Sequence, residues 1–226
     1  MATSAGLTVP YITVRHGETP DLERHLCVRP GPDGRQRLAW INEGPGDRDL
    51  RGVLWGRVSQ ELGIDRRPEG TPRWRLVHPA RQRETMLYLQ CQVCVTRVRD
   101  VHRQSTPAAR PGVLFLAAQG ADLKAPVRIA QPPVCVEHAR LSAHSCTHLV
   151  RHGHIALLAR RYRLYGVIGT PYELTLQGLR PLPADDTPLP YGDPRLDWFL
   201  ASQLVRELDD FETVDLADLT ATTWSS

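Results

Sequence analysis

The chain has 226 residues, of which 41% are hydrophobic and 23% charged, and its formal net charge is +3 at pH 7. These values fit a globular protein of one large or two small domains and exclude a disordered or collagen-like chain. No apolar run approaches the roughly 18 residues that span a bilayer, and the first residues lack the basic and apolar regions of a signal peptide. We therefore expect a cytoplasmic protein with no membrane partner, and the net charge alone is too small to predict a nucleic-acid partner.

The first part of the chain is predicted to be β-rich. β-Branched and aromatic residues predict strands over 9–14, 37–42 and 52–58, separated by polar turns that contain proline and glycine. Good helix formers predict a helix over 79–90 that leads into a Cys-Gln-Val-Cys motif. We therefore expect a small antiparallel sheet in an N-terminal region of residues 1–87.

The middle of the chain is predicted to combine short strands with one helix. The apolar runs at 112–118 and 126–131 predict the two strands of a hairpin, and a Pro-Pro pair before 135–146 predicts the start of a helix. Residues 154–174 predict strands interrupted by glycines, with a helix in the first half as the alternative. The Pro-, Gly- and Asp-rich residues 178–194 predict a linker.

The C-terminal part contains the clearest helical pattern. Within residues 193–210, apolar side chains recur at the i, i+3 and i+4 spacing of one helix face; they are Leu196, Phe199, Leu200, Leu204 and Leu208. The first four of these should be buried. A short strand, Glu-Thr-Val-Asp-Leu, follows. We predict an α+β fold in which residues 88–226 hold a treble-clef-like zinc module, further strands and an amphipathic helix over 195–208, as a second domain or integrated with the first.

The spacing of the cysteines predicts a metal centre. Cys91 and Cys94 form a CxxC pair, in which two thiolates of one tight turn can bind one ion. Cys135 and His138 lie three residues apart at the start of the predicted helix, and side chains at i and i+3 share one helix face. The order of knuckle, hairpin and helix is that of a treble clef. We therefore predict a structural Zn²⁺ site, because four protein ligands leave no open position on the ion.

Other roles for the cysteines remain open. Cys146 or His148 could replace His138 as the fourth ligand, and the CxxC pair could consist of ordinary buried cysteines. A redox role is disfavoured, because the motif does not open a thioredoxin-like βαβ unit. Cys27 stands alone, far upstream of the other cysteines, and has no predicted role.

Several segments of the chain resemble a family of uncharacterised actinobacterial zinc-binding proteins. The segments that carry the resemblance are RLAWINEGPGDRDLRGVLW, VHPARQRETM, CQVC, PPVCVEHARL, CTHLVRHGHIAL and WFLASQLVREL, and it covers about residues 35–215. The relatives have a second CxxC pair where this chain has CVEH, so His138 stands in the place of a cysteine. The family has no assigned activity, so the resemblance implies a zinc ion but no reaction.

Three short motifs also resemble those of histidine phosphatases, in the order VRHGET, HPARQRETM and RHGHIALL. The chemistry would use His16 as the nucleophile towards phosphorus. The phosphate-binding and pocket residues would be Arg15, Arg24, Arg81 and His152. Each motif is short and arginine is abundant, and a zinc module between the second and third motifs would interrupt the phosphatase core. We keep this activity as an alternative.

Nucleic-acid chemistry provides two further hypotheses. An HNH-type nuclease shares the treble-clef frame, and its candidate histidines are His102, His144 and His148, but the chain has no asparagine after residue 42. Binding without catalysis could use arginines interleaved with aromatic residues. The residues with that pattern are Arg151, Arg160, Arg161, Tyr162, Arg163 and Tyr165. An arginine-rich solvated strand face is the favoured interpretation of this cluster.

The leading functional hypothesis is a cytoplasmic accessory or regulatory protein with a structural zinc site. Its partner would be a protein or a nucleic acid. The alternative is an enzyme with a structural zinc ion, most concretely a histidine-phosphatase-like hydrolase that uses His16, and less so an HNH-type nuclease. The sequence leaves the substrate, the partner and the oligomeric state undetermined.

Overall fold

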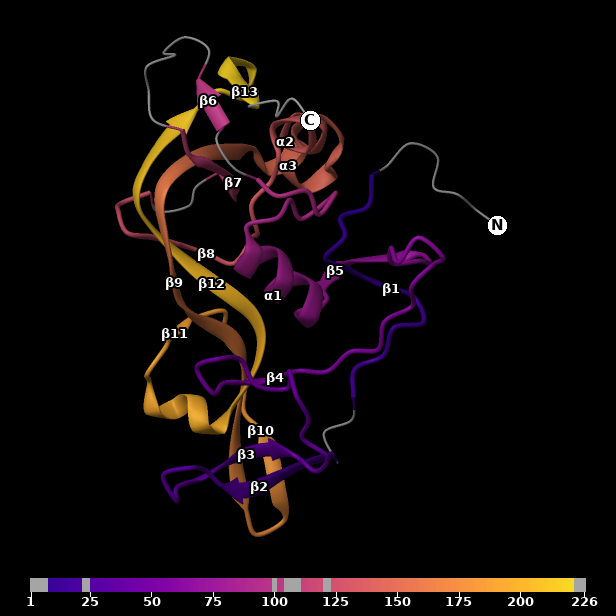
Figure 1. The fold of residues 1–226 in the computed structure, drawn as a ribbon, viewed down its shortest axis with the longest axis vertical. Helices are drawn as coiled ribbons and strands as arrows, with labels where there is room; N and C mark the ends of the chain where they lie inside the picture. The colour runs from indigo at the N-terminus through magenta and orange to yellow at the C-terminus, as the bar shows by residue number, and fades with distance from the viewer. Residues whose placement is uncertain (1–7, 22–24, 99–100, 104–110, 120–122, 222–226) are drawn as a thin grey trace. The chain divides into compact units, whose positions relative to one another are not determined.

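A computed structural model describes residues 8–21, 25–98, 101–103, 111–119 and 123–221. The described residues are mostly sheet, with 43% strand and 18% helix (Figure 1). The predicted α+β class with a C-terminal helix is therefore wrong. The described residues contain short α-helices only, and none of these helices is long and apolar enough to cross a membrane.

The chain forms two compact units that are each built from separate segments. Unit 1 consists of Met1–Ile12, Glu84–Leu164 and Arg206–Ser226, and unit 2 consists of Thr13–Arg83 and Tyr165–Val205. Two long neighbouring strands, β9 (His154–Thr175) and β12 (Phe199–Val214), run from one unit into the other. The strands predicted over 154–174 are thus one continuous strand, and the alternative helix there is wrong.

In unit 1, two short strands flank these long strands. Strand β7 (Val113–Ala118) runs antiparallel to β9, with Phe115 opposite Leu157, and β8 (Val127–Ile129) runs antiparallel to β12. Both strands were predicted, but their pairing as a hairpin is wrong, because each pairs with a different long strand. The treble-clef order therefore lacks its hairpin. The inward side chains of all four strands form the core of unit 1.

The described residues contain three α-helices. Helix α1 (Pro79–Tyr88) confirms the predicted helix before the CxxC motif, and it begins with a proline in its first turn, where no backbone donor is needed. Helix α2 (Val136–Ser145) confirms the helix predicted after the Pro-Pro pair, and α3 (Thr147–His152) follows it directly. At the end of unit 1, β13 (Leu219–Ala221) pairs with β6 (Val101–Arg103).

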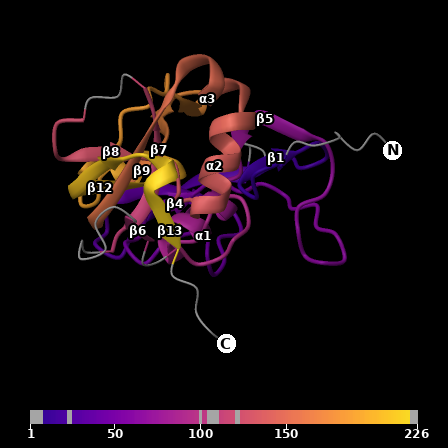
Figure 2. The same ribbon diagram turned by 90° about the horizontal axis from the view of Figure 1, so that it is seen from above.

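The N-terminal half of unit 2 contains two small antiparallel sheets. Strand β1 (Thr13–Arg15) pairs with β5 (Pro72–Val77), and the two lie side by side in both views (Figure 2). Strand β2 (Leu26–Pro30), which was not predicted, pairs with β3 (Gln36–Trp40). The prediction of one small antiparallel N-terminal sheet is therefore wrong, because none of the strands predicted over 9–14, 37–42 and 52–58 pairs with another of them.

The remaining strands of unit 2 join the long strands. Strand β4 (Leu54–Trp55) runs parallel to β12, and β10 (Gly178–Pro181) and β11 (Leu189–Pro190) run antiparallel to β9. The predicted linker over 178–194 thus contains two strands. Its prolines are compatible with strand structure because these strands are short and lie beside only one partner.

The predicted amphipathic helix over 195–208 is wrong. A short 3₁₀ turn (Pro194–Trp198) leads into β12, which continues to Val214 and includes most of the strand predicted at 212–216. Residues 204–208 are buried on both faces of the sheet, so apolar side chains do not alternate with polar ones there. A doubly covered strand of this kind has a pattern that periodicity alone cannot distinguish from a helix. Burial itself was predicted correctly for Leu196, Phe199 and Leu204, whereas Leu200 is half-buried.

Truncation of Leu204 should destabilise the protein because this side chain is only 2% exposed. Leu204→Ala should lower the free energy of unfolding by about 2–5 kcal/mol, the range for a leucine removed from a packed core. Denaturant unfolding measures this loss. A loss below about 1 kcal/mol would contradict the packing of this strand.

Candidate metal centre

Four potential metal ligands converge in unit 1. The ligand atoms of Cys91, Cys94, Cys135 and His138 all lie within 4.8 Å of one another. These are the four residues predicted from the spacing of the motifs. They come from the turn after α1 and from the first turn of α2, which are about 40 residues apart in the sequence.

Backbone hydrogen bonds shape the turn that carries the CxxC pair. The N–H of Cys91 donates to Thr96 O at 2.8 Å, and the N–H of Val95 donates to Cys91 O at 2.9 Å. The N–H of Val98 donates to Leu89 O at 2.7 Å and closes the outer end of the turn. These bonds satisfy the polar backbone of a tight loop, so both thiols are presented on one side of it.

One hydrogen bond joins this turn to the segment that supplies the other ligand pair. The N–H of Gln92, between the two cysteines, donates to Pro133 O at 2.9 Å. The next residue, Val134, donates its N–H to Leu114 O of β7 at 2.9 Å. The CxxC turn and the start of α2 are thus both held against the core strands of unit 1, and this contact brings the two pairs together.

Helix α2 is fixed by its apolar face and by one arginine. Val136 and Ala139 are buried in the core of unit 1. Arg140 donates from Nε to Leu216 O at 3.0 Å and from Nη2 to Leu219 O at 2.8 Å. The first turn of α2 is therefore anchored, and Cys135, its N-cap, and His138 point to one place.

The end of α1 is held by a buried arginine of β12. Arg206 is 7% exposed and donates to the carbonyl oxygens of Met86 and Leu87, with distances of 2.9–3.2 Å, and to that of Tyr162. The last carbonyls of a helix have no partner within the helix, and a cation there also complements its dipole. Desolvation lowers the pKa of Arg206 to about 10, so it keeps its charge at neutral pH. The arginine thereby fixes the point from which the CxxC turn starts.

The distances between donor atoms fit a bound cation better than a disulfide. The Sγ atoms of Cys94 and Cys135 are 4.0 Å apart, and all five cysteines of the chain are free thiols. Two sulfurs on one tetrahedral metal ion are about 3.8 Å apart for bonds of about 2.3 Å, whereas bonded sulfurs are about 2.05 Å apart. The Cys135 Sγ to His138 Nδ1 distance is 3.0 Å. The two atoms would move slightly apart to bind the same ion.

The thiols are electrostatically coupled. A hydrogen bond from the Cys135 thiol lowers the pKa of Cys91 to about 5; burial opposes this shift, and the backbone N–H groups of Cys135, Cys94 and Val93 add to it. The same pairing with Cys91, together with burial, raises the pKa of Cys135. A cation at this position would displace protons from the thiols, since cysteine binds metal ions as the thiolate.

The CxxC turn is strained at Val95, whose φ is +65°. A β-branched residue rarely adopts this left-handed conformation, which costs about 1–3 kcal/mol, whereas glycine adopts it freely. Val95→Gly should therefore raise the free energy of unfolding by about 1 kcal/mol, after the entropy that a glycine loses on folding. The same substitution at Val98, which is 3% exposed and has no positive φ, should lower stability instead. Thermal unfolding of both variants measures the two signs, and destabilisation by Val95→Gly would contradict the strain.

Of the two alternative ligands, Cys146 does not join the cluster. Cys146 is the C-cap of α2, ten residues beyond the helix start, and is not among the four converging residues. The side chain of His148 lies outside the described part of the chain. Cys27 belongs to β2 of unit 2 and is half-buried. The interpretation of the CxxC pair as ordinary buried cysteines is also weakened, because only Cys91 is fully buried.

The residues of the phosphatase hypothesis serve a different purpose. Arg81, 1% exposed, donates from Nη1 and Nη2 to the two carboxylate oxygens of Glu18 at 2.5 and 2.8 Å, and from Nη2 to Thr13 O at 2.8 Å. Its guanidinium thus binds a carboxylate of the protein where the hypothesis requires a phosphate. His16 is exposed beyond this pair, and Arg24 lies outside the described residues. His152 ends α3 in unit 1.

Acidic side chains neutralise much of the arginine cluster predicted at 151–165. Arg160 pairs with Glu212 at 2.6 Å, and Arg163 pairs with Glu207 at 2.6 Å, across the neighbouring strands β9 and β12. Asp210 and Asp209 add longer contacts to the same two arginines. The structure therefore agrees with a solvated, ion-paired strand face. The nuclease candidate His144 is exposed and bonds only to the helix backbone, and the side chain of His102 lies outside the described residues.

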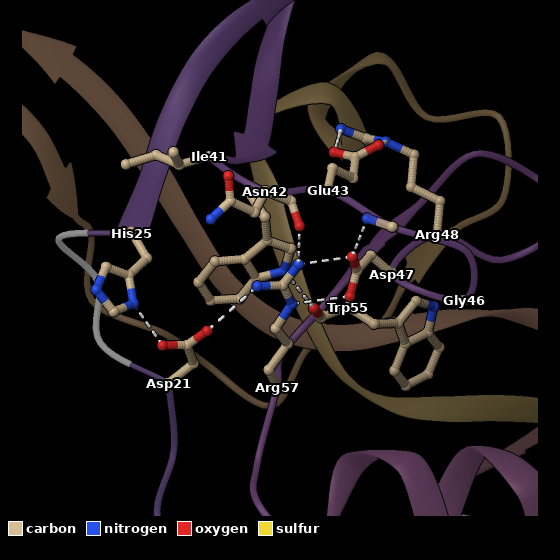
Figure 3. A network of polar contacts seen from close by, with 12 residues as sticks. Asp21, His25, Ile41, Asn42, Glu43, Gly46, Asp47, Arg48, Trp55 and Arg57 are labelled. Atoms are coloured by element: carbon tan, nitrogen blue, oxygen red, sulfur yellow. Dashed lines mark hydrogen bonds and ion pairs between the residues drawn. The ribbon is translucent and has the colours of Figure 1, made fainter.

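Unit 2 contains a polar network around Arg57 that sequence analysis missed (Figure 3). Arg57 binds both oxygens of Asp47, at 2.8 and 2.6 Å, contacts Asp21 at 3.3 Å and lies over the ring of Trp40. Asp21 in turn binds His25 Nδ1 at 2.6 Å. The hydrogen bonds that Arg57 donates to the Asp47 carboxylate lower the pKa of Asp47 and raise the pKa of Arg57. Both groups stay charged at neutral pH.

A cavity of about 160 Å³ opens beside this network, and its lining includes Asp47, Trp55, Arg57 and Arg83. Arg83 lies over the ring of Trp55 and donates to Gly46 O at 3.0 Å. Both carboxylate oxygens of Asp47 are committed to Arg57, so this acid is not available as a general base.

Comparison with known proteins adds no identification. No family model matches the chain, and no curated protein and no solved structure matches it. The functional argument therefore depends on the geometry of the metal centre and of the surface.

Proposed function

We propose that the chain is a zinc-binding protein whose metal ion is structural and whose function is to bind a partner. The observation that carries the proposal is the convergence of three thiols and one imidazole within 4.8 Å from two separate parts of the sequence. Such a donor set is typical of Cys₃His zinc sites. The resemblance to an actinobacterial zinc-binding family points in the same direction.

The choice of zinc follows from the chemistry of the donors. Thiolate and imidazole are soft or borderline ligands, which disfavour magnesium and calcium, since those ions require oxygen. A tetrahedral S₃N set fits zinc, which has no preference for a planar or octahedral geometry. Free thiols in close proximity also favour a reducing compartment, in agreement with the cytoplasmic location expected from the sequence.

A structural role follows from the number and surroundings of the ligands. The four protein donors fill a tetrahedral ion, so no position stays open for water or substrate. Cys91 is 0% exposed and belongs to the core of unit 1. An ion at this place would cross-link the CxxC turn to α2, and its binding free energy would contribute directly to folding.

Metal analysis of the purified protein tests this proposal. Protein prepared without chelator should contain about one zinc ion per chain, and removal of the metal by a chelator should lower the melting temperature, because the ion binds the folded state. Cobalt substitution should give the ligand-field and thiolate charge-transfer bands of a tetrahedral thiolate site. Protein without stoichiometric metal, or chelation without loss of stability, would overturn the proposal.

A further inference from the structure

Strand β5 in unit 2 is the exposed member of its two-stranded sheet. Val77 lies opposite Thr13 and Pro72 lies opposite Arg15, so four residues of β5 face a single residue of β1. This difference makes residues 73–76 a large, irregular bulge. Among the described residues, β5 pairs with β1 alone. The bulge therefore presents the sequence Arg-Trp-Arg-Leu away from its partner strand.

Every side chain of the bulge is exposed. Trp74 is 54% exposed and Leu76 is 42% exposed, and Arg73 and Arg75 are exposed as well. The other tryptophans of the described residues are covered: Trp40 and Trp55 are buried, and Trp198 is half-buried. A tryptophan left in solvent between two cations is not explained by packing of the core. Tryptophan is enriched at interaction sites, where its large ring provides contact area.

The two arginines of the bulge carry uncompensated charge. Within the described part of the chain, no acidic group forms an ion pair with Arg73 or Arg75, and residues 71–77 include no acid. The arginines of β9 are different, because Arg160 and Arg163 are paired with acids of β12. The bulge thus combines an exposed tryptophan with two arginines whose positive charges have no acidic partner in the described part of the chain.

We propose that the Arg73–Leu76 bulge is a binding site for single-stranded nucleic acid. An exposed indole gives a stacking platform that any base can use, and flanking guanidinium groups bind the phosphates on either side. The sugar-phosphate chain has the negative charge that complements this surface. A second copy of the chain is disfavoured as the occupant, since pairing of two bulges would bring their arginines together with no acid among residues 71–77 to compensate them. The inference names the partner of the proposed binding protein and rests on that function, but it does not involve the metal centre.

Fluorescence anisotropy of a labelled single-stranded oligonucleotide tests the site in the full, metal-loaded protein. Trp74→Ala should weaken binding by about tenfold or more, the usual effect of removing one stacking platform, whereas Trp74→Tyr should retain most of the affinity. Removing both arginines, with Arg73→Ala and Arg75→Ala, should reduce the slope of log K against log salt concentration by about 1.4, or 0.7 per lost phosphate contact. Arg160→Ala is the matched control, and it should leave the slope unchanged because that arginine is already ion-paired.

Three results would overturn the site. The first is that the protein does not bind the oligonucleotide at low salt, and the second is that wild type and Trp74→Ala bind it equally well. The third is that poly-glutamate displaces the oligonucleotide at an equal concentration of charge. The last result would assign the bulge to an acidic protein segment instead. Zinc content and melting temperature are measured on the same samples. Stoichiometric zinc and an unchanged melting temperature without nucleic-acid binding would mean that this inference fails and the zinc proposal stands. Nucleic-acid binding by protein that lacks zinc would mean that the zinc proposal fails and this inference stands.

Discussion

Cys91→Ser should abolish stoichiometric zinc binding and cause most of the protein to accumulate in insoluble form. Cys91 is 0% exposed in the core of unit 1, and its sulfur lies within 4.8 Å of the other three donors. A structural zinc ion contributes on the order of 10 kcal/mol or more to the folding of small modules, which exceeds the whole stability of many domains. Metal analysis and soluble yield are the measurements, with denaturant unfolding of the soluble fraction.

Two further variants separate the loss of zinc from a general effect of changing cysteines. His138→Cys should keep about one zinc ion per chain, because thiolate and imidazole are both good zinc ligands. Cys27→Ser should alter neither metal content nor yield, because Cys27 lies in β2, outside the cluster. Retention of one equivalent of zinc by Cys91→Ser would contradict the assignment of the ligands.

Glu18→Ala should lower the free energy of unfolding by about 3–5 kcal/mol, because it leaves a buried guanidinium without its counter-charge. Glu18 and Arg81 are each 1% exposed, and both carboxylate oxygens bind Arg81. The N–H of Arg15 donates to the same carboxylate at 2.6 Å. Chemical unfolding measures the loss. Glu173→Ala is the matched control, because its pair with Arg180 is exposed and should contribute less than about 1 kcal/mol.

The same pair should make stability depend on pH in the acid range. Burial raises the pKa of Glu18, but hydrogen bonds from Arg81 and from the Arg15 N–H outweigh it and hold that pKa below its ordinary value of 4.5. The contribution is therefore fully present above about pH 4.5 and is lost as pH falls through the lower pKa of the folded state. Unfolding measured from pH 7 to pH 3 should show a steeper decline in wild type than in Glu18→Ala, and parallel declines would contradict the linkage.

The composition of the metal centre could be predicted from the sequence because its information is local. A CxxC pair lies in one turn, and Cys135 and His138 lie on one helix turn, so each pair is specified by spacing alone. The convergence of the two pairs is not local. It depends on the contact of Gln92 with Pro133 and on the packing of Val134 against β7, which no pattern in the sequence indicates.

Much of the fold was less predictable because long-range pairing decided it. The strands at 113–118 and 127–129 were found, but each pairs with a different long strand instead of with its neighbour in sequence. In the same way, the VRHGET and HPARQRETM motifs suggested phosphate chemistry when each was taken in isolation. In the folded protein Arg81 of the second motif, a predicted phosphate ligand, pairs with Glu18 of the first and stabilises unit 2.

The sequence by itself determined the helix before the CxxC motif, the helix that begins after Cys135, some of the short strands and the identity of the four candidate donors, since these depend on spacing within about ten residues. Only the tertiary structure decided that residues 199–214 form a strand, because coverage of both sheet faces removes the alternation by which strands are recognised. It also decided which arginines are neutralised. Arg160 and Arg163 meet acids on the neighbouring strand, whereas Arg73 and Arg75 do not, and charge partners across strands cannot be read from one strand alone.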